Sequence, residues 1–327
     1  MGEKLQVAIV GLGLVGASAG LALRRFQDRV YVIGHDRNPE VAGRARKMGA
    51  VDRTEWNLIN TVRSADRVIL ALPLNEIHDT LEAIAGELKT GCVIVDTADV
   101  KKPVMAWARE LLPDDTYFVG GHPIVVADEA TLDAARADLF DQKMFCLTPD
   151  LRTNDTAVRL AADVAEALGA RPYFLDAEEH DGLVAAVEHL PAIAAAALLS
   201  LLTTSSGWGD LRKVAGGQFF ASTLLSAADG QAAMDGPFAN REIVALWLDR
   251  LIGELSAWRE QLLNGEEEAV VAQVDRGLAA GRSWLLAQAR GNWDDQAPAV
   301  DMPTAGSSMR DMMFGRLGRM PERPRRR

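Results

Sequence analysis

The sequence predicts an α/β protein in which a doubly wound, mostly parallel sheet is followed by an all-helical domain. Up to about residue 175, short β-rich runs alternate with stretches of helix length, which is typical of a parallel sheet with helices on both faces. From Ala177 onward, long alanine- and leucine-rich segments follow without a strand pattern. The last stretch contains four prolines and, from Arg310 onward, seven arginines. We therefore divide the chain into residues 1–175, 176–290 and a flexible Pro/Arg-rich tail, 291–327.

The individual elements follow from the same patterns. The expected strands are 5–10, 29–33, 67–71, 92–95, 117–119, 144–148 and 172–175, and the expected helices of the second domain include 177–203, 238–264 and 266–290. The segment 243–255 is so apolar that it packs either in the core of its own chain or against a second subunit, and the sequence favours neither. In the tail, a solvated extension is favoured over an arm that reaches a partner subunit through Met309, Met312, Met313 and Phe314.

Composition and charge exclude several classes of protein. The 327 residues carry a formal net charge of −11, which argues against a general nucleic-acid binder because phosphate neutralisation needs a basic face. The chain runs directly into a strand, so we expect no signal peptide. The apolar run Leu190–Leu202 contains Pro191 and is too short to cross a bilayer. We expect a cytoplasmic protein without a membrane partner. Cys92 and Cys146 are expected to be inert core residues, and the sequence has no zinc or iron–sulfur spacing.

The first strand runs into a G-x-G-x-x-G motif formed by Gly11, Gly13 and Gly16, with Leu14 and Val15 between the last two glycines. In a Rossmann-type domain the first glycine makes the tight turn, the second lets the backbone approach a pyrophosphate, and the third allows close packing of the helix against the strand. The helix N-terminus supplies unpaired amides and the positive end of its dipole. The motif therefore predicts a dinucleotide site that includes these five residues.

Asp36 follows Gly16 by twenty residues and comes after a second apolar strand. This spacing places a carboxylate where the adenosine ribose hydroxyls bind. An acid at this position favours NAD over NADP because it repels a 2′-phosphate, although the neighbouring Arg37 is compatible with NADP. Leu72 and Pro73 follow another strand and suit the nicotinamide side of the cofactor, although simple loop packing explains them equally well.

Ligands of open α/β sheets bind at the carboxyl ends of the strands, and two polar loops are expected there. One contains Asp99 and the other contains His122, between Gly121 and Pro123. A histidine accepts a proton readily near neutral pH when a hydroxyl is oxidised, and we expect His122 to be that base. Asp99 either orients His122 or caps a helix. At the start of the helical domain, His189 is a better candidate than His180 to face the cleft.

These motifs together resemble the prephenate and arogenate dehydrogenases of tyrosine biosynthesis, over about residues 5–290. The resemblance implies a Rossmann-type domain, a helical dimerisation domain and a homodimer. It also implies NAD-linked oxidative decarboxylation of a cyclohexadiene, in which hydride leaves the hydroxyl-bearing ring carbon and loss of carbon dioxide makes the ring aromatic. His122 matches the family's catalytic histidine. The matching segments are the glycine motif ending at Gly16, Asp96–Lys101, Gly121–Pro123, Ala135–Phe140, Asp176–Asp181 and His189–Pro191.

The departures from the family pattern concern the substrate. Asp99 stands where the family has serine, and Ala192 replaces a second histidine. The run Phe219–Leu224 lacks both arginines of the family's carboxylate-binding segment, and Ile124–Val126 is bulkier than the family's Met-Ala-Gly. We expect Asp99, Glu188, His189 and Lys101 to face the substrate, with Lys101, Lys102 and Arg241 as candidates to replace the lost carboxylate contact.

Three hypotheses follow. The leading one is an NAD-dependent dehydrogenase of prephenate/arogenate type. The second is a dehydrogenase or reductase of the same fold for a neutral or amine-bearing substrate, because Asp99 and Glu188 can pair with a cation. The third is a non-catalytic nucleotide-binding protein. The presence of His122 favours an enzyme.

Overall fold

The computed structural model describes residues 4–126, 131–150, 153–225 and 229–290. Its first half is one sheet with strand order β3-β2-β1-β4-β5-β6-β7-β8. The strands are β1 (Leu5–Val10), β2 (Val30–His35), β3 (Arg53–Thr54), β4 (Arg67–Leu70), β5 (Val93–Asp96), β6 (Tyr117–Pro123), β7 (Met144–Pro149) and β8 (Arg171–Phe174). Neighbouring strands are parallel except β6 and β7, which are antiparallel. The predicted mostly parallel sheet is confirmed.

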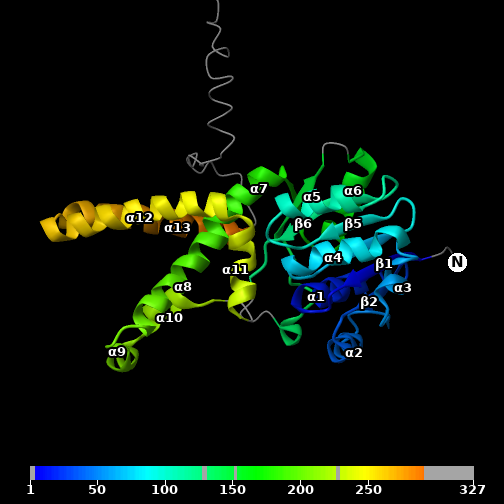
Figure 1. Ribbon diagram of the computed structural model, residues 1–327, viewed down its shortest axis with the longest axis horizontal. Coiled ribbons are helices and arrows are strands. Elements are labelled where there is room, and N and C mark those ends of the chain that lie inside the picture. Colours follow the sequence, from blue (N-terminus) through cyan, green and yellow to red (C-terminus); the bar gives the residue numbers. More distant parts are fainter. Residues whose placement is uncertain (1–3, 127–130, 151–152, 226–228, 291–327) are drawn as a thin grey trace, which may run out of the picture.

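Helices cover both faces of this sheet (Figure 1). One face packs against α1 (Leu14–Leu23), α2 (Pro39–Lys47) and α6 (Asp155–Ala167). The opposite face packs against α3 (Leu58–Val62), α4 (Leu74–Ile84) and α5 (Lys102–Leu111). The sheet is therefore doubly wound, as predicted. Cys92 and Cys146 are buried and unbridged, and burial raises the pKa of these thiols to about 12 and about 11.

Two features of the sheet differ from the sequence-based expectation. The two-residue strand β3 carries no apolar alternation, which is why its pattern did not indicate a strand. Strand β6 was expected to end at residue 119 but continues to Pro123, because its backbone pairs with β7 from Val119 to Pro123. Glycines are depleted in strands, so Gly120 and Gly121 suggested a loop. His122 consequently lies within a strand, opposite Cys146, and not in the expected loop.

The described residues of the second half form helices joined by short loops and include no strand, as predicted. Its elements are α7 (Ala177–Val184), the π-helical turn η4 (Ala185–His189), α8 (Leu190–Thr203), α9 (Trp208–Val214), α10 (Gly217–Thr223), α11 (Gly230–Ala239), α12 (Arg241–Asn264) and α13 (Glu267–Arg290). Figure 1 shows α8, α12 and α13 extending away from the sheet. The expected tail, 291–327, lies outside the described residues.

The helix expected at residues 177–203 is confirmed. The helix continues without a break from Ala177 to Thr203, through the π-helical turn and past Pro191. Its 27 residues, with a mean hydropathy of 1.8 in the most apolar window, are long and apolar enough to cross a membrane by length and composition, and 28% of that window is buried. The apolar run Leu190–Leu202 is only part of this helix, and the core helix of a soluble protein meets the same criteria of length and composition. The wide turn η4 accommodates Pro191, which lacks an N–H and would clash within a regular α-helix.

Candidate active site

A cavity of about 510 Å³ opens at the carboxyl ends of β1, β2 and β4. Its lining includes Gly11, Gly13, Asp36, Leu72 and Pro73, all of which the sequence pattern assigned to cofactor binding. This is the edge where ligands of doubly wound sheets bind. The structure thus brings the glycine motif, the acid and the apolar loop together around one crevice.

The three glycines of the motif occupy different environments. Gly11 has a φ of +88°, and a Cβ atom there would clash with the carbonyl of Ala71. A Cβ atom on Gly16 would clash with the carbonyl oxygen of Gly11, so the helix approaches the turn as closely as its backbone allows. Gly13, by contrast, has nothing within 4 Å of the position of a Cβ. Open space beside Gly13 is what a pyrophosphate needs at the start of α1.

The side chains around this motif make different kinds of contact within the protein. Asp36 accepts the Leu12 N–H (2.9 Å) and the Asn38 N–H (2.8 Å), which fixes its carboxylate at the crevice. Arg37 forms an ion pair with Glu76 (2.6 Å). The side chains of Leu14 and Val15 pack into or against the hydrophobic core. Their contribution to a dinucleotide would therefore come from the backbone amides of the first turn of α1.

His122 is nearly buried, with 9% of its surface exposed, and its ring is held by a second histidine. Its Nδ1 lies 3.0 Å from Nε2 of His180, and Nδ1 of His180 lies 2.9 Å from Oδ1 of Asp181. Burial, followed by the charges of His180 and Lys101, lowers the pKa of His122 to about 3, and the charge of Asp99 opposes this shift. At neutral pH, His122 is therefore a neutral imidazole that can accept a proton.

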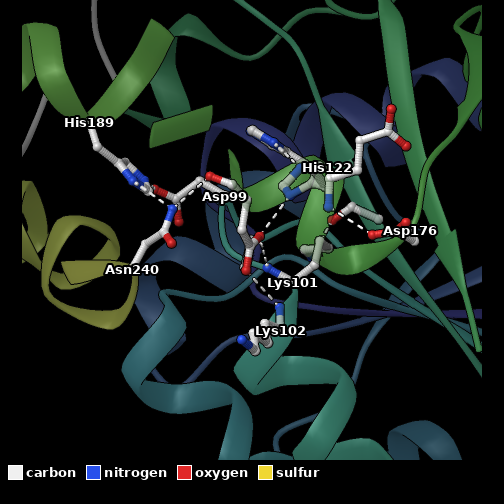
Figure 2. A network of polar contacts seen from close by, with 12 residues as sticks. Asp99, Lys101, Lys102, His122, Asp176, His189 and Asn240 are labelled. Carbon is white, nitrogen blue, oxygen red and sulfur yellow. Dashed lines mark hydrogen bonds and ion pairs between the residues drawn. The ribbon is translucent and has the colours of Figure 1, made fainter. Parts of the chain in front are cut away.

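Asp99 pairs with His189 (Figure 2), with Oδ2 of Asp99 3.2 Å from Nε2 of His189. Burial alone would raise the pKa of Asp99, but the hydrogen bond from His189 and the charges of His122 and His189 lower it below its usual value. Asp99 is not the cap of α5, because Lys101 occupies that position. Nor does Asp99 orient His122 by a hydrogen bond, because His180 bonds Nδ1 of that ring. The two roles expected from the sequence are thus replaced by a pairing with the helical domain.

Glu188 and His189 lie in the π-helical turn η4, on the side of the helical domain that meets the Asp99 loop. Burial and the nearby charge of Asp99 raise the pKa of the Glu188 carboxyl, and His189 opposes this. Helix α11 closes over the pair: a Cβ atom on Gly236 would clash with the Asp99 carboxylate and lie 2.9 Å from Nε2 of His189. The helical and sheet domains therefore meet at Asp99 and His189.

Lys101 is placed differently from the sequence-based expectation. Its side chain is fully buried, its ammonium pairs with Asp96, and it donates to the Gly121 carbonyl (2.5 Å). Asp96 also accepts the Gly121 N–H (2.9 Å). With its charge neutralised inside the protein, Lys101 fixes the strand that carries His122 and is not placed to grip a substrate carboxylate.

The other two candidate cations, Lys102 and Arg241, line a common cavity of about 300 Å³ with Asp181 and Asn240. This cavity lies between the start of α5 and the start of α12. No local pattern indicates that these two residues meet, since they are 139 positions apart. The interdomain geometry thus brings these two cationic side chains to one cavity, which Glu242 also lines.

Comparison with known proteins follows the same division into two parts. Residues 19–174 match the model of the prephenate dehydrogenase nucleotide-binding domain, and residues 176–276 match that of the prephenate dehydrogenase dimerization domain. The chain is 30% identical over 255 residues to a cyclohexadienyl dehydrogenase of Zymomonas mobilis, covering 77% of this chain and 87% of that protein. The chain belongs to the prephenate dehydrogenase family.

Two further relatives bear on the site. A solved prephenate dehydrogenase of Aquifex aeolicus, in complex with hydroxyphenyl propionate and NAD+, superposes with a TM-score of 0.79 at 26% identity, covering 86% of this chain and 99% of that one. A more distant relative, the 4-amino-4-deoxyprephenate dehydrogenase of Streptomyces pristinaespiralis, is 27% identical over 256 residues and covers 75% of each chain. Like its family, this protein is an NAD-dependent dehydrogenase. The open space at Gly13 and the fixed Asp36 carboxylate fit that cofactor.

The residues that sequence reasoning missed are those that act across domains. His180 was ranked below His189, although its ring contacts His122 directly. Asp181 and Asn240 were not singled out, although Asn240 donates to the Asp181 carbonyl (2.7 Å) and lies 3.5 Å from Nδ1 of His189. The run Asp176–Asp181 was a motif of the resemblance, which was the available signal for His180 and Asp181. No local pattern around Asn240 indicated its role.

Proposed function

We propose that this protein catalyses the NAD-dependent oxidative decarboxylation of a prephenate-type cyclohexadiene, with His122 as the proton acceptor. The observation that carries the proposal is the buried, neutral His122 ring at the carboxyl edge of the sheet, held through Nδ1 by His180. Among the described residues, Nε2 of His122 has no hydrogen-bond partner, so this nitrogen is available to a substrate. Family membership and the relatives' activities support the same reaction.

In this reaction, bound NAD supplies the hydride acceptor. His122 takes the proton of the ring hydroxyl through Nε2 while the C–H electron pair leaves the same carbon. The C–CO₂ bond then breaks, and its electron pair completes the aromatic ring. Helix α11 and the Asp99–His189 pair lie over this site, where they exclude water and hold the substrate between the two domains. Lys102 and Arg241 are the proposed contacts for a substrate carboxylate.

The test is the rate of nicotinamide reduction with prephenate or arogenate in the wild-type protein and two variants. We expect His122→Ala to lower kcat by about 100-fold or more, since a positioned general base contributes about 10²- to 10⁴-fold. His78→Ala is the matched control because His78 is partly exposed on α4, and it should retain wild-type rates. Full activity in His122→Ala would refute the assigned base.

A second candidate substrate has an ammonium in place of the ring hydroxyl. The Asp99 carboxyl group interacts with His122 and His189, and that of Glu188 interacts with Asp99 and His189. A cation on the substrate would pair with these two carboxyl groups. The relative that acts on 4-amino-4-deoxyprephenate supports this candidate. Comparing kcat/KM for the hydroxyl and amino substrates decides it: Asp99→Ser should shift the preference toward the hydroxyl substrate by about 10-fold or more if the amine is native.

The proposal also covers assembly and location. We propose a homodimer formed through the helical domain, supported by the match of residues 176–276 to a dimerization domain. Apolar side chains on α12 and α13 are exposed in the single chain, including Leu255, Leu262 and Leu285. The boundary at residues 175 and 176 is supported by the point where the two family models meet. A cytoplasmic location is the proposal that suits a soluble biosynthetic dehydrogenase.

A further inference from the structure

A chain of buried hydrogen bonds extends from His122 into the helical domain. Nδ1 of His122 lies 3.0 Å from Nε2 of His180, and Nδ1 of His180 lies 2.9 Å from Oδ1 of Asp181. His180 and Asp181 are 0% and 1% exposed. Because His122 belongs to β6 and the other two residues to α7, the chain crosses from the sheet domain to the helical domain.

The backbone N–H groups that bind Asp181 determine the donor and the acceptor of each hydrogen bond in this row. The Asp181 carboxylate accepts the backbone N–H of Lys101 at Oδ1 (2.7 Å) and that of Lys102 at Oδ2 (2.9 Å). Both amides lie at the beginning of α5, where the helix dipole favours a negative charge. An ionised carboxylate only accepts hydrogen bonds. His180 must therefore carry its proton on Nδ1 and donate it to Asp181.

The tautomer of His180 determines that of His122. A neutral imidazole with its proton on Nδ1 has a bare Nε2, so Nε2 of His180 accepts the Nδ1–H of His122. His122 is then left with a bare Nε2. We propose that Asp181 and His180 are positioning residues that hold His122 in its Nδ1–H tautomer and share the positive charge when Nε2 takes the substrate proton.

The hydrogen bonds to His180 and Asp181 can stabilise protonated His122, which burial alone would destabilise. Burial disfavours imidazolium, yet a useful base must hold its proton for part of the reaction. The groups that act on His122 are Asp99, Lys101, His180 and His189, of which Asp99 alone favours its protonation. Asp181 is a second negative group, and its hydrogen bond to His180 lets it stabilise the protonated His122 indirectly. No proton leaves these three residues. The Nδ1 protons of His122 and His180 shift toward their acceptors, and the positive charge spreads over both rings.

The tautomers are directly measurable because the chain has only five histidines. Two-bond ¹H–¹⁵N spectra of the full-length, histidine-labelled protein distinguish Nδ1–H from Nε2–H, with His122→Ala and His180→Gln used for assignment. We expect Nδ1–H for both His122 and His180. In Asp181→Asn, the amide can donate to His180 Nδ1, which should drive both rings to Nε2–H. The matched control is Asp79→Asn, beside the partly exposed His78, 3.2 Å away.

The kinetic arm rests on the proposed function. Asp181→Asn should lower kcat by about 100-fold or more, as reversal of a tautomer does in a catalytic triad, with KM and NAD affinity nearly unchanged. His180→Gln keeps an acceptor for His122 and should retain its Nδ1–H tautomer with a smaller loss of kcat. A wild-type spectrum with Nε2–H on His122 would overturn the inference, and this result does not depend on whether Asp181→Asn folds. Unchanged tautomers in the spectrum of folded Asp181→Asn would also overturn it. Expected tautomers without turnover of any cyclohexadiene would instead refute the proposed function alone.

Discussion

At the scale of single residues, His122, the proposed base, is held by a ring from a distant part of the chain. The sequence predicts His122 at the ligand edge of a parallel sheet, and in the structure it lies near the carboxyl end of β6. Its hydrogen-bond partner lies 58 positions away, and no local pattern reveals which distant ring will meet it. Lys101 illustrates the same limit, because a lysine in a charged loop looks exposed until Asp96 and Gly121 are seen to surround it.

The buried Lys101–Asp96 pair predicts a large loss of stability when one partner is removed. Lys101→Met should lower the free energy of unfolding by about 3–5 kcal/mol, because it leaves an uncompensated buried carboxylate. Lys213→Met, which breaks an exposed pair with Asp210, should change it by less than about 1 kcal/mol. Urea unfolding of both variants measures the difference. Equal effects would mean that the buried pair does not stabilise the site.

The lowered pKa of His122 predicts loss of stability in acid. Since this pKa is about 3 in the folded protein, against 6.5 for an unperturbed histidine, the unfolded chain takes up a proton first as the pH falls below 6.5. Stability is therefore fully present above this value and decreases toward pH 3, by about 2 kcal/mol at pH 5. His122→Gln should weaken this dependence between pH 7.5 and 5 in urea unfolding. If the free energy of unfolding depends on pH identically in the variant, His122 is not the group responsible for the loss of stability in acid.

At the scale of elements, long periodic helices and buried strands were predictable from the sequence. Strand segments that form only because a neighbouring strand pairs with them were not. Strand β6 extends past two glycines because β7 supplies backbone partners, which depends on tertiary contacts. The helices α9, α10 and α11 are short, and their residues include several glycines that weaken a helical pattern. Of these three helices, α11 brings its backbone at Gly236 close to Asp99 and His189.

The close approach of α11 predicts a selective effect of one methyl group. Gly236→Ala should force α11 away from the Asp99–His189 pair and lower kcat/KM by about 10-fold or more, with NAD affinity retained, because a small misplacement in an active site is costly. Gly230→Ala in the same helix meets no atom within 4 Å and should leave kinetics unchanged. Similar kinetics for the two variants would show that α11 does not shape the substrate site.

At the scale of the whole molecule, the sequence predicted two domains but could not place them. The segment 243–255 was equally compatible with an internal core and with a second subunit. In the single chain, Leu246, Ile252 and Leu255 are exposed and Val244 is the buried apolar residue of α12 among those described. This exposure favours the second subunit, since large apolar surfaces mark interfaces.

The exposed face of α12 predicts a dimer that charge can disrupt. Light scattering of the wild-type protein should give about twice the chain mass of 35.3 kDa. The double variant Leu255→Lys and Leu262→Lys should shift the mass toward the monomer, because the two leucines are seven residues apart on one helix face. Trp56→Lys, which replaces a still more exposed apolar residue of the sheet domain, should remain dimeric. A monomeric wild-type protein would contradict the proposed assembly.

We propose that hydride removal, proton transfer to His122 and loss of carbon dioxide occur in one site. The most direct measurement is the ratio of reduced nicotinamide to released carbon dioxide during turnover of a prephenate-type substrate, in the wild type and in His122→Ala. We expect a ratio of one in the wild type, and we expect the rates of formation of both products to fall together by about 100-fold or more in the variant. Reduced nicotinamide without carbon dioxide, or unchanged turnover without His122, would contradict it.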